Sequence, residues 1–391
     1  MFISLPIICP KNEDLGKISF KELSISEAEL VLAVAQLNIH TLADNQFLLD
    51  LYLGNALKAI RFGFGQGNGW RSKISIDDVE AKQQIAGAIG FSAGAMLMHT
   101  DLGVDWRNIF PVKPTDVVNP NKKQERPDLL CIGNNFKTLI ECKGTTRKDK
   151  VSEMVLDAIG QVKNTGMKGH TITDAYASCA FIPLKHTATD PFLMACDPPV
   201  KGNDFSSIIY EDIDTLRQDQ YVRMCRYSGL NILADMILSE EEHPGTISSV
   251  RREIYNLNVI NIDNVTFLAR VIDVPQKMRN NEYFHNTRLV LGIQRDIVSQ
   301  LLDYQKGFSL ETINRDYISP DQKEAFLSTG ICLRMVKEED LPIKERHRWL
   351  SRNRAKETPA QIWNNNSCNS RSFGGQVQQE DESNTRERMR F

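Results

Sequence analysis

No run of apolar residues in this sequence is long enough to cross a membrane. The longest, from Ile85 to Met98, has 14 residues and is rich in glycine, whereas a transmembrane helix needs about 20 apolar residues. The N-terminus lacks both the basic segment and the long apolar segment of a signal peptide. We therefore expect a soluble, cytoplasmic protein without a membrane partner.

Cysteine and histidine are too scattered to build a site. None of the eight cysteines forms a CxxC pair, and no group of cysteine and histidine has the spacing of zinc ligands. A chain of 391 residues can bury a hydrophobic core without disulfide bonds. We interpret the cysteines as free thiols in a reducing cytosol.

Neither sign of charge is in excess. The chain has 47 Lys and Arg residues against 50 Asp and Glu residues, a net charge of −3. The total charge therefore neither supports nor excludes a nucleic-acid partner, and local charge has to be examined instead. The glycine-rich stretch 63–70 matches neither the dinucleotide-binding pattern nor the P-loop pattern, so we predict a loop without a nucleotide site.

The length predicts two or three structural units, because domains usually contain about 100 to 200 residues. The predicted regions are a helical N-terminal region (1–75), an α/β core (76–190), a mainly helical C-terminal region (200–343) and a basic, disordered tail (344–391). Outside the core we predict helices that start at Ser26–Glu29 or cover 45–60, 215–238 and 287–302, and strands over 265–274 and 330–336.

The core has a regular order of patterns. A helix over 77–98 carries many small residues, which permit close packing on a sheet. Two apolar runs, 129–132 and 137–142, are separated by a Gly-Asn-Asn turn and predict a β-hairpin. Helical spacing over 151–162 and a buried strand over 175–184 follow. This order predicts an α/β sandwich around a small mixed sheet.

The hairpin carries the residues with the clearest chemistry. Side chains alternate between the faces of a strand, so Glu141 and Lys143 point to one face and Cys142 to the other. Asp128 opens the neighbouring strand, and a tight turn brings it beside Glu141. Two carboxylates placed in this way suit Mg²⁺ or Mn²⁺. A metal there polarises a phosphodiester and activates water, and a lysine adds positive charge.

These residues resemble the PD-(D/E)xK nuclease superfamily, which has the restriction-endonuclease-like fold. The matching residues are Pro127-Asp128 and Glu141-Cys142-Lys143, and the resemblance covers about residues 77–185. It implies a core of helix, three strands, helix and strand. It also implies that Asp128 and Glu141 are metal ligands and that Lys143 is the catalytic lysine.

The resemblance suggests two more site residues. Many members of the superfamily have a glutamate on the first core helix, and Glu80 is the candidate here. Some have a glutamine on the helix after the lysine, and Gln161 fits that position. A subset also has a tyrosine four residues after this glutamine, but position 165 is Thr.

The acidic-x-Lys triplet is short, so its context matters. The chain contains three such triplets, starting at Glu80, Glu141 and Asp321. The first lies in a predicted helix and the third follows Ser319-Pro320. The middle triplet has the strand, the upstream Pro-Asp and the downstream helix that a nuclease site needs. The alternative is an edge hairpin with a surface glutamate and lysine.

Local charge around the hairpin is positive. Residues 113–168 contain 11 Lys or Arg and 7 Asp or Glu, a net of +4. The candidates for phosphate contacts are Arg147, Lys148, Lys150 and Lys163. The alternative is a solvated entrance to the following helix. The same two interpretations apply to the basic run 344–356, which contains Trp349.

Two other function classes compete with the nuclease. Residues 90–94 read Gly-Phe-Ser-Ala-Gly, which has the spacing of the nucleophile elbow of α/β-hydrolases and would make Ser92 a nucleophile. That elbow needs a strand before the serine and several βα units upstream, whereas residues 1–75 look helical. A third hypothesis is a catalytically inactive, nuclease-like module that only binds nucleic acid.

DNA is the expected substrate of such a nuclease, although the sequence itself does not distinguish DNA from RNA and does not define strandedness or sequence specificity. A role in restriction or phage defence follows from analogy at the level of the fold. Residues 200–343 show no phosphate loop, triad or metal-ligand cluster. We expect them to supply specificity or assembly, as a homo-oligomer or with a partner in a defence complex.

Overall fold

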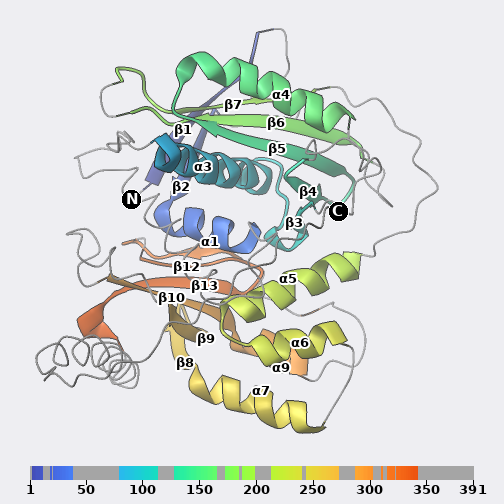
Figure 1. The fold of residues 1–391 in the computed structure, drawn as a ribbon, viewed down its shortest axis with the longest axis vertical. Coiled ribbons are helices and arrows are strands. Elements are labelled where there is room, and N and C mark those ends of the chain that lie inside the picture. The colour runs from blue at the N-terminus through green and yellow to red at the C-terminus, as the bar shows by residue number, and fades with distance from the viewer. Residues whose placement is uncertain are drawn as a thin grey trace, which may run out of the picture. The chain divides into compact units, whose positions relative to one another are not determined.

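The computed structural model describes residues 2–11, 18–19, 21–37, 79–112, 127–164, 172–184, 187–198, 213–239, 244–272, 287–302, 310, 315–321 and 323–341. These residues form mixed α/β structure with two β-sheets (Figure 1). Both sheets belong to one compact unit, residues 1–340. The predictions for 45–60, 63–70 and 344–391 lie outside the described residues.

The first sheet has seven strands in the order β2-β1-β7-β6-β5-β4-β3. Its strands are β1 (Phe2–Ile8), β2 (Glu22–Ser26), β3 (Ile109–Pro111), β4 (Leu129–Ile132), β5 (Lys137–Thr145), β6 (Asp174–Phe181) and β7 (Phe192–Cys196). β3, β4 and β5 pair antiparallel, and β5 pairs parallel to β6. The sheet is therefore mixed, as predicted.

The core order is also found. Helix α3 (Val79–Thr100) precedes β3, β4 and β5, and helix α4 (Val151–Asn164) leads into β6. The two helices cover opposite faces of the sheet. α3 lies against Cys142 on one face, whereas α4 packs with Ala177 and Cys179 on the other. The predicted β-hairpin is confirmed, and β5 runs three residues beyond the predicted end at Cys142.

Small residues explain how α3 reaches the sheet. A Cβ atom added at Gly90 would overlap the carbonyl oxygen of Lys143, and one added at Gly144 would overlap the carbonyl oxygen of Ala86. The backbones of α3 and β5 are therefore in direct contact, which only glycine permits. The helix supports β5 directly behind the residues of the predicted site.

The prediction of a mostly helical N-terminal region is wrong for the described part, because β1 and β2 form an antiparallel pair. Leu5, Leu23 and Ile25 are buried at strand spacing. The helix start at Ser26 is confirmed as α1 (Glu27–Leu37). The Ser26 N–H donates to Glu29 Oε2 at 2.8 Å, and the Glu29 N–H donates to Ser26 Oγ at 3.1 Å. This reciprocal pair is a capping box.

The C-terminal region is not mainly helical, because it contains a second sheet of six antiparallel strands in the order β11-β12-β13-β10-β9-β8. Its strands are β8 (Asn258–Ile262), β9 (Val265–Ile272), β10 (Thr287–Gln294), β11 (Tyr317–Ile318), β12 (Glu324–Phe326) and β13 (Ile331–Lys337). Its helices are α5 (Ile213–Tyr227), α6 (Asn231–Ser239), α7 (Pro244–Asn256) and α9 (Arg295–Leu302).

Two predicted helices of this region need correction. Residues 287–302, predicted as one helix, form strand β10 followed by helix α9. The prediction failed because β10 is buried on both faces, so its sequence lacks the alternation of apolar and polar residues that marks a strand. The predicted helix 215–238 is two helices, α5 and α6. Gly229 separates them with a φ of +85°, a left-handed conformation that glycine adopts without strain.

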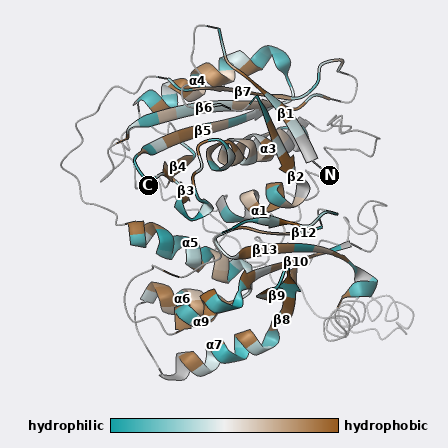
Figure 2. Cartoon of the chain, turned by 180° about the vertical axis from the view of Figure 1, so that it is seen from behind, coloured by the Kyte–Doolittle hydropathy of each residue, from teal (hydrophilic) through white to brown (hydrophobic). Residues whose placement is uncertain are grey.

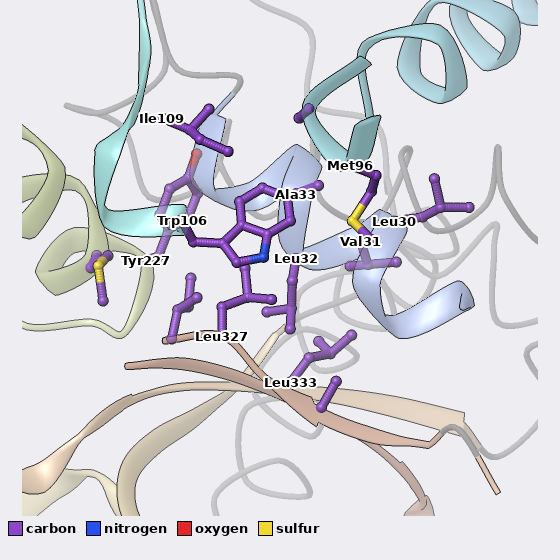
Figure 3. Close-up of a cluster of buried hydrophobic side chains, with 14 of the residues drawn as sticks. Leu30, Val31, Leu32, Ala33, Met96, Trp106, Ile109, Tyr227, Leu327 and Leu333 are labelled. Atoms are coloured by element: carbon purple, nitrogen blue, oxygen red, sulfur yellow. The ribbon is translucent and has the colours of Figure 1, made fainter. Parts of the chain in front are cut away.

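The core between the two sheets is centred on Trp106, which is 1% exposed. Its ring lies between α1 and the second sheet, near Leu327 and Leu333 (Figure 3). In Figure 2 the strands of both sheets carry many hydrophobic residues. None of the helices in the described ranges is long and apolar enough to span a membrane.

Candidate functional site

The register of the hairpin places Asp128 beside Glu141. Leu129 pairs with Ile140, and the Asp128 N–H donates to the Ile140 carbonyl at 3.1 Å. The Asp128 side chain turns back toward β5, where Oδ2 accepts the backbone N–H of Cys142 at 2.8 Å. The Ile140 carbonyl thus fixes the backbone of Asp128, and the Cys142 N–H holds its carboxylate at the middle of β5, next to Glu141.

Glu141 and Lys143 lie on the face of β5 that α4 covers. Their partners on β6 are Ala177 and Cys179, both of which pack against α4. The Lys143 ammonium donates to Glu141 Oε1. Lys143 Nζ also lies 3.4 Å from Oε1 of Gln161 on α4.

The fold therefore brings four predicted site residues together. Asp128 directly precedes β4, Glu141 and Lys143 lie on β5, and Gln161 comes from the covering helix α4. Asp128, Glu141 and Lys143 are local in sequence. Gln161 reaches them because α4 runs back across the sheet.

Burial makes Glu141 unusual. The residue is 2% exposed, and its Oε2 atom is buried with no hydrogen-bond partner within the described part of the chain. A buried carboxylate oxygen without a partner is costly, because it loses its hydration and gains nothing in return. Such an atom is a candidate ligand for a bound cation.

The surroundings of Glu141 and Lys143 also shift their pKa values. Burial, and then the charge of Asp128, raise the pKa of Glu141 to about 8, although Lys143 opposes the shift. Burial alone would lower the pKa of Lys143, but the carboxylates of Glu141 and Asp128 outweigh it and raise this pKa. The site thus holds two nearby carboxylates with one lysine. A second cation would stabilise both carboxylates in their charged form.

These residues fit a divalent cation in part. Carboxylate oxygens are the donors that Mg²⁺ and Mn²⁺ prefer, and the unpartnered Oε2 of Glu141 is available for one. Within the ranges given above, no group of three His, Cys, Asp or Glu residues could hold a metal ion. Asp128 and Glu141 are the candidate ligands among the described residues.

No protein-family model, curated protein or solved structure matches the chain.

Glu80 is the second residue of α3, and its side chain is outside the described residues. The helix that carries it does pack against β5 behind the site. Its role as a third carboxylate stays a prediction.

The four basic candidates lie around the ends of α4. Arg147 pairs with Asp149 at 2.6 Å, and Lys150 pairs with Glu153. Arg147 and Lys148 are exposed, whereas Lys150 and Lys163 are half-buried. Surface ion pairs are weak, so a phosphate can replace the carboxylate partners. Contact of these residues with nucleic acid stays a prediction.

Ser92 does not form a nucleophile elbow. Residues 79–100 are one continuous helix, so no strand precedes the serine as the elbow requires. Ser92 is 0% exposed, and its hydroxyl donates to the Leu30 carbonyl at 3.4 Å. Its neighbours are small because α3 packs closely on the sheet.

The sequence did not predict that α5 packs on the same face of the sheet as Glu141. Leu216 of α5 joins a buried cluster with Leu130, Leu139 and Val162, on the same face as Glu141. α5 was expected to belong to a separate region. A single leucine on an amphipathic helix gives no signal of its distant partner, so this contact was not predictable from the pattern.

Proposed function

We propose that the protein is a metal-dependent nuclease of the PD-(D/E)xK type. The observation that carries the proposal is the buried, unpartnered Oε2 of Glu141 beside the carboxylate of Asp128 and the ammonium of Lys143. An edge hairpin with surface charges would leave the glutamate in water. A buried carboxylate and a half-buried one, together with a lysine, are the groups that metal-dependent hydrolysis of a phosphodiester needs.

Asp128 and Glu141 are the residues that would hold Mg²⁺ or Mn²⁺. Such an ion supplies positive charge to the phosphodiester and lowers the pKa of water. The Cys142 N–H fixes Asp128, which keeps its carboxylate in place before any ligand binds. The burial that makes Glu141 costly without a cation also excludes competing water and strengthens its interaction with one.

Lys143 contributes the second positive charge. Its ammonium stays protonated, because the neighbouring carboxylates raise its pKa, and it can stabilise negative charge that develops on the phosphate. Gln161 positions this ammonium from α4. The glutamine is a positioning residue in this proposal, since it acts through Lys143.

The element order supports the same assignment. Helix, three strands, helix and strand, with β5 and β6 parallel, is the order of a restriction-endonuclease-like core. We propose DNA as the preferred substrate and restriction or phage defence as the setting, by analogy with proteins of this architecture.

The test is cleavage of plasmid DNA, linear DNA and RNA by the purified chain, with Mg²⁺ or with EDTA. We expect cleavage only with the metal. Lys143→Ala should reduce the rate by about 100- to 1000-fold, the usual effect of removing one well-placed stabilising group. Lys323→Ala is the matched control, because Lys323 ends a triplet of the same type but is 62% exposed beside Asp321.

Cleavage that persists in EDTA would contradict the proposal, and so would undiminished cleavage by Lys143→Ala. Binding without cleavage in any metal would favour the inactive nucleic-acid-binding module instead.

A further inference from the structure

Helix α7 has an outward face with unbalanced positive charge. In the sequence, Arg251 and Arg252 are followed at once by Glu253, which suggests a mixed, solvated surface. The fold separates them. Both carboxylate oxygens of Glu253 accept the backbone N–H of Ile232, at 3.1 and 3.0 Å, at the start of α6.

Glu253 is therefore used inside the fold as a cap. Val250 is fully buried and Ile254 packs against the same core, so these residues define the inner face of α7. Arg251 and Arg252 are exposed on the other side. The one acidic residue between 247 and 256 does not neutralise them.

Neither arginine has an ion-pair partner among the residues that the structure describes. Elsewhere in this region four bases pair with acids: Arg226 with Asp235, Arg315 with Asp263, Lys323 with Asp321 and Lys337 with Glu339. Glu240 to Glu242 precede α7 and lie outside the described residues. Within the described ranges, the two arginines thus lack the acidic partner that these four bases have.

An exposed aromatic ring lies on the same face. Tyr255 is 74% exposed and is separated from Arg251 and Arg252 by one helical turn, so the three side chains are neighbours. Figure 2 shows both hydrophilic and hydrophobic residues along α7. Val259, which is 62% exposed on the edge strand β8, follows Tyr255 by four residues.

We propose that this face of α7 binds the backbone of a nucleic acid, as an anchor separate from the Glu141 site. Two exposed guanidinium groups complement phosphates, and arginine is the side chain that matches their geometry best. The tyrosine ring stacks on a base of a single strand. The proposal rests on the nuclease function for the identity of the polyanion, since the substrate of that site is a polyphosphate chain.

The test measures binding in EDTA, so that cleavage does not interfere. Fluorescence anisotropy would follow duplex DNA, single-stranded DNA and RNA across a range of salt concentrations. For Arg251→Ser/Arg252→Ser, the slope of log K against log salt should fall by about 1.8 for duplex DNA and about 1.4 for a single strand. The control Lys323→Ser/Lys337→Ser removes two exposed charges elsewhere and should keep the wild-type slope.

Tyr255→Ala should weaken single-strand binding by about 5-fold or more, whereas Tyr255→Phe keeps the ring and should bind as wild type. No loss of affinity in Tyr255→Ala would refute the stacking contact. An unchanged salt slope in the double arginine variant would overturn the anchor.

The two proposals fail in different ways. If the chain cleaves DNA with Mg²⁺ but the arginine variant binds with the wild-type slope, the nuclease stands and the anchor is wrong. If the slope falls but no metal supports cleavage, the anchor stands and the nuclease is wrong. A change in oligomeric state without a change in slope would mean that α7 contacts a second copy of the chain, which also overturns the anchor.

Discussion

Glu141 provides a quantitative test of the metal site through stability alone. Its pKa is raised to about 8 in the folded, metal-free chain, whereas its ordinary value is 4.5. An acid with a raised pKa contributes stability below its unfolded pKa and loses it as pH rises toward the folded value. The metal-free protein should therefore be destabilised by this residue as pH rises from 4.5 to 8.

The magnitude follows from the two pKa values. One pKa unit corresponds to about 1.4 kcal/mol, so at pH 7 the burial of Glu141 costs on the order of 3 kcal/mol. Because the residue is 2% exposed, solvent screening does not reduce this figure much. Glu141→Gln keeps the shape of the side chain and removes the titration. In EDTA, its stability relative to wild type should rise by roughly 2 to 3 kcal/mol between pH 5 and pH 7.

The assay is urea unfolding of both proteins in EDTA at several pH values, followed by titration with Mg²⁺. Metal should stabilise wild type, because it binds only the folded site, and should have little effect on Glu141→Gln. Asp321→Asn is the control, since Asp321 is an exposed carboxylate whose pKa is lowered by its Ser319 hydrogen bond. A difference between wild type and Glu141→Gln that does not change with pH would refute the reasoning. Equal stabilisation of both by Mg²⁺ would refute the ligand assignment.

Three further predictions follow from the contacts around the site. Gly90→Ala should destabilise the protein by about 1 to 3 kcal/mol and reduce cleavage, since it pushes on Lys143. Gly87→Ala is the control, because nothing lies within 4 Å of the added carbon, and it should not destabilise the protein. Equal melting temperatures for Gly90→Ala and Gly87→Ala would contradict this prediction. Lys143→Ala should keep or tighten Mg²⁺ binding in calorimetry, because it removes a nearby positive charge; weaker binding would show that the lysine organises the ligands. Burial alone would lower the pKa of His99. The Asp316 carboxylate, whose Oδ2 lies 2.6 Å from His99 Nε2, outweighs the effect of burial and raises this pKa. His99 should therefore stabilise the fold below about pH 6.5 and lose this effect as pH rises, and His99→Gln should abolish that part of the pH dependence of melting.

Much of the candidate site was predictable because it is local. Asp128, Glu141 and Lys143 lie within one hairpin, and strand alternation together with a short turn sets their faces and register. The helix over 151–162 was equally clear from its spacing, and so was the helix start at Ser26. Each of these signals depends on residues a few positions apart.

Other features depended on contacts between distant residues. β1 pairs with β7 across almost 190 positions, and no local pattern distinguishes such a strand from a short helix. β10 was predicted as a helix because both of its faces are buried, which removes the strand period. In each case the partner that decides the conformation lies far along the chain.

The sequence by itself determined which chemical groups this protein has and the faces of the strands on which they lie. Only the tertiary structure decided their environment. Burial beside Asp128 left one oxygen of Glu141 without a partner among the described residues. The cap on α6 turned the carboxylate of Glu253 toward Ile232, whereas Arg251 and Arg252 stay exposed. The physical reason is that the energy of a charge depends on its distance from water and from other charges, and the fold sets both distances.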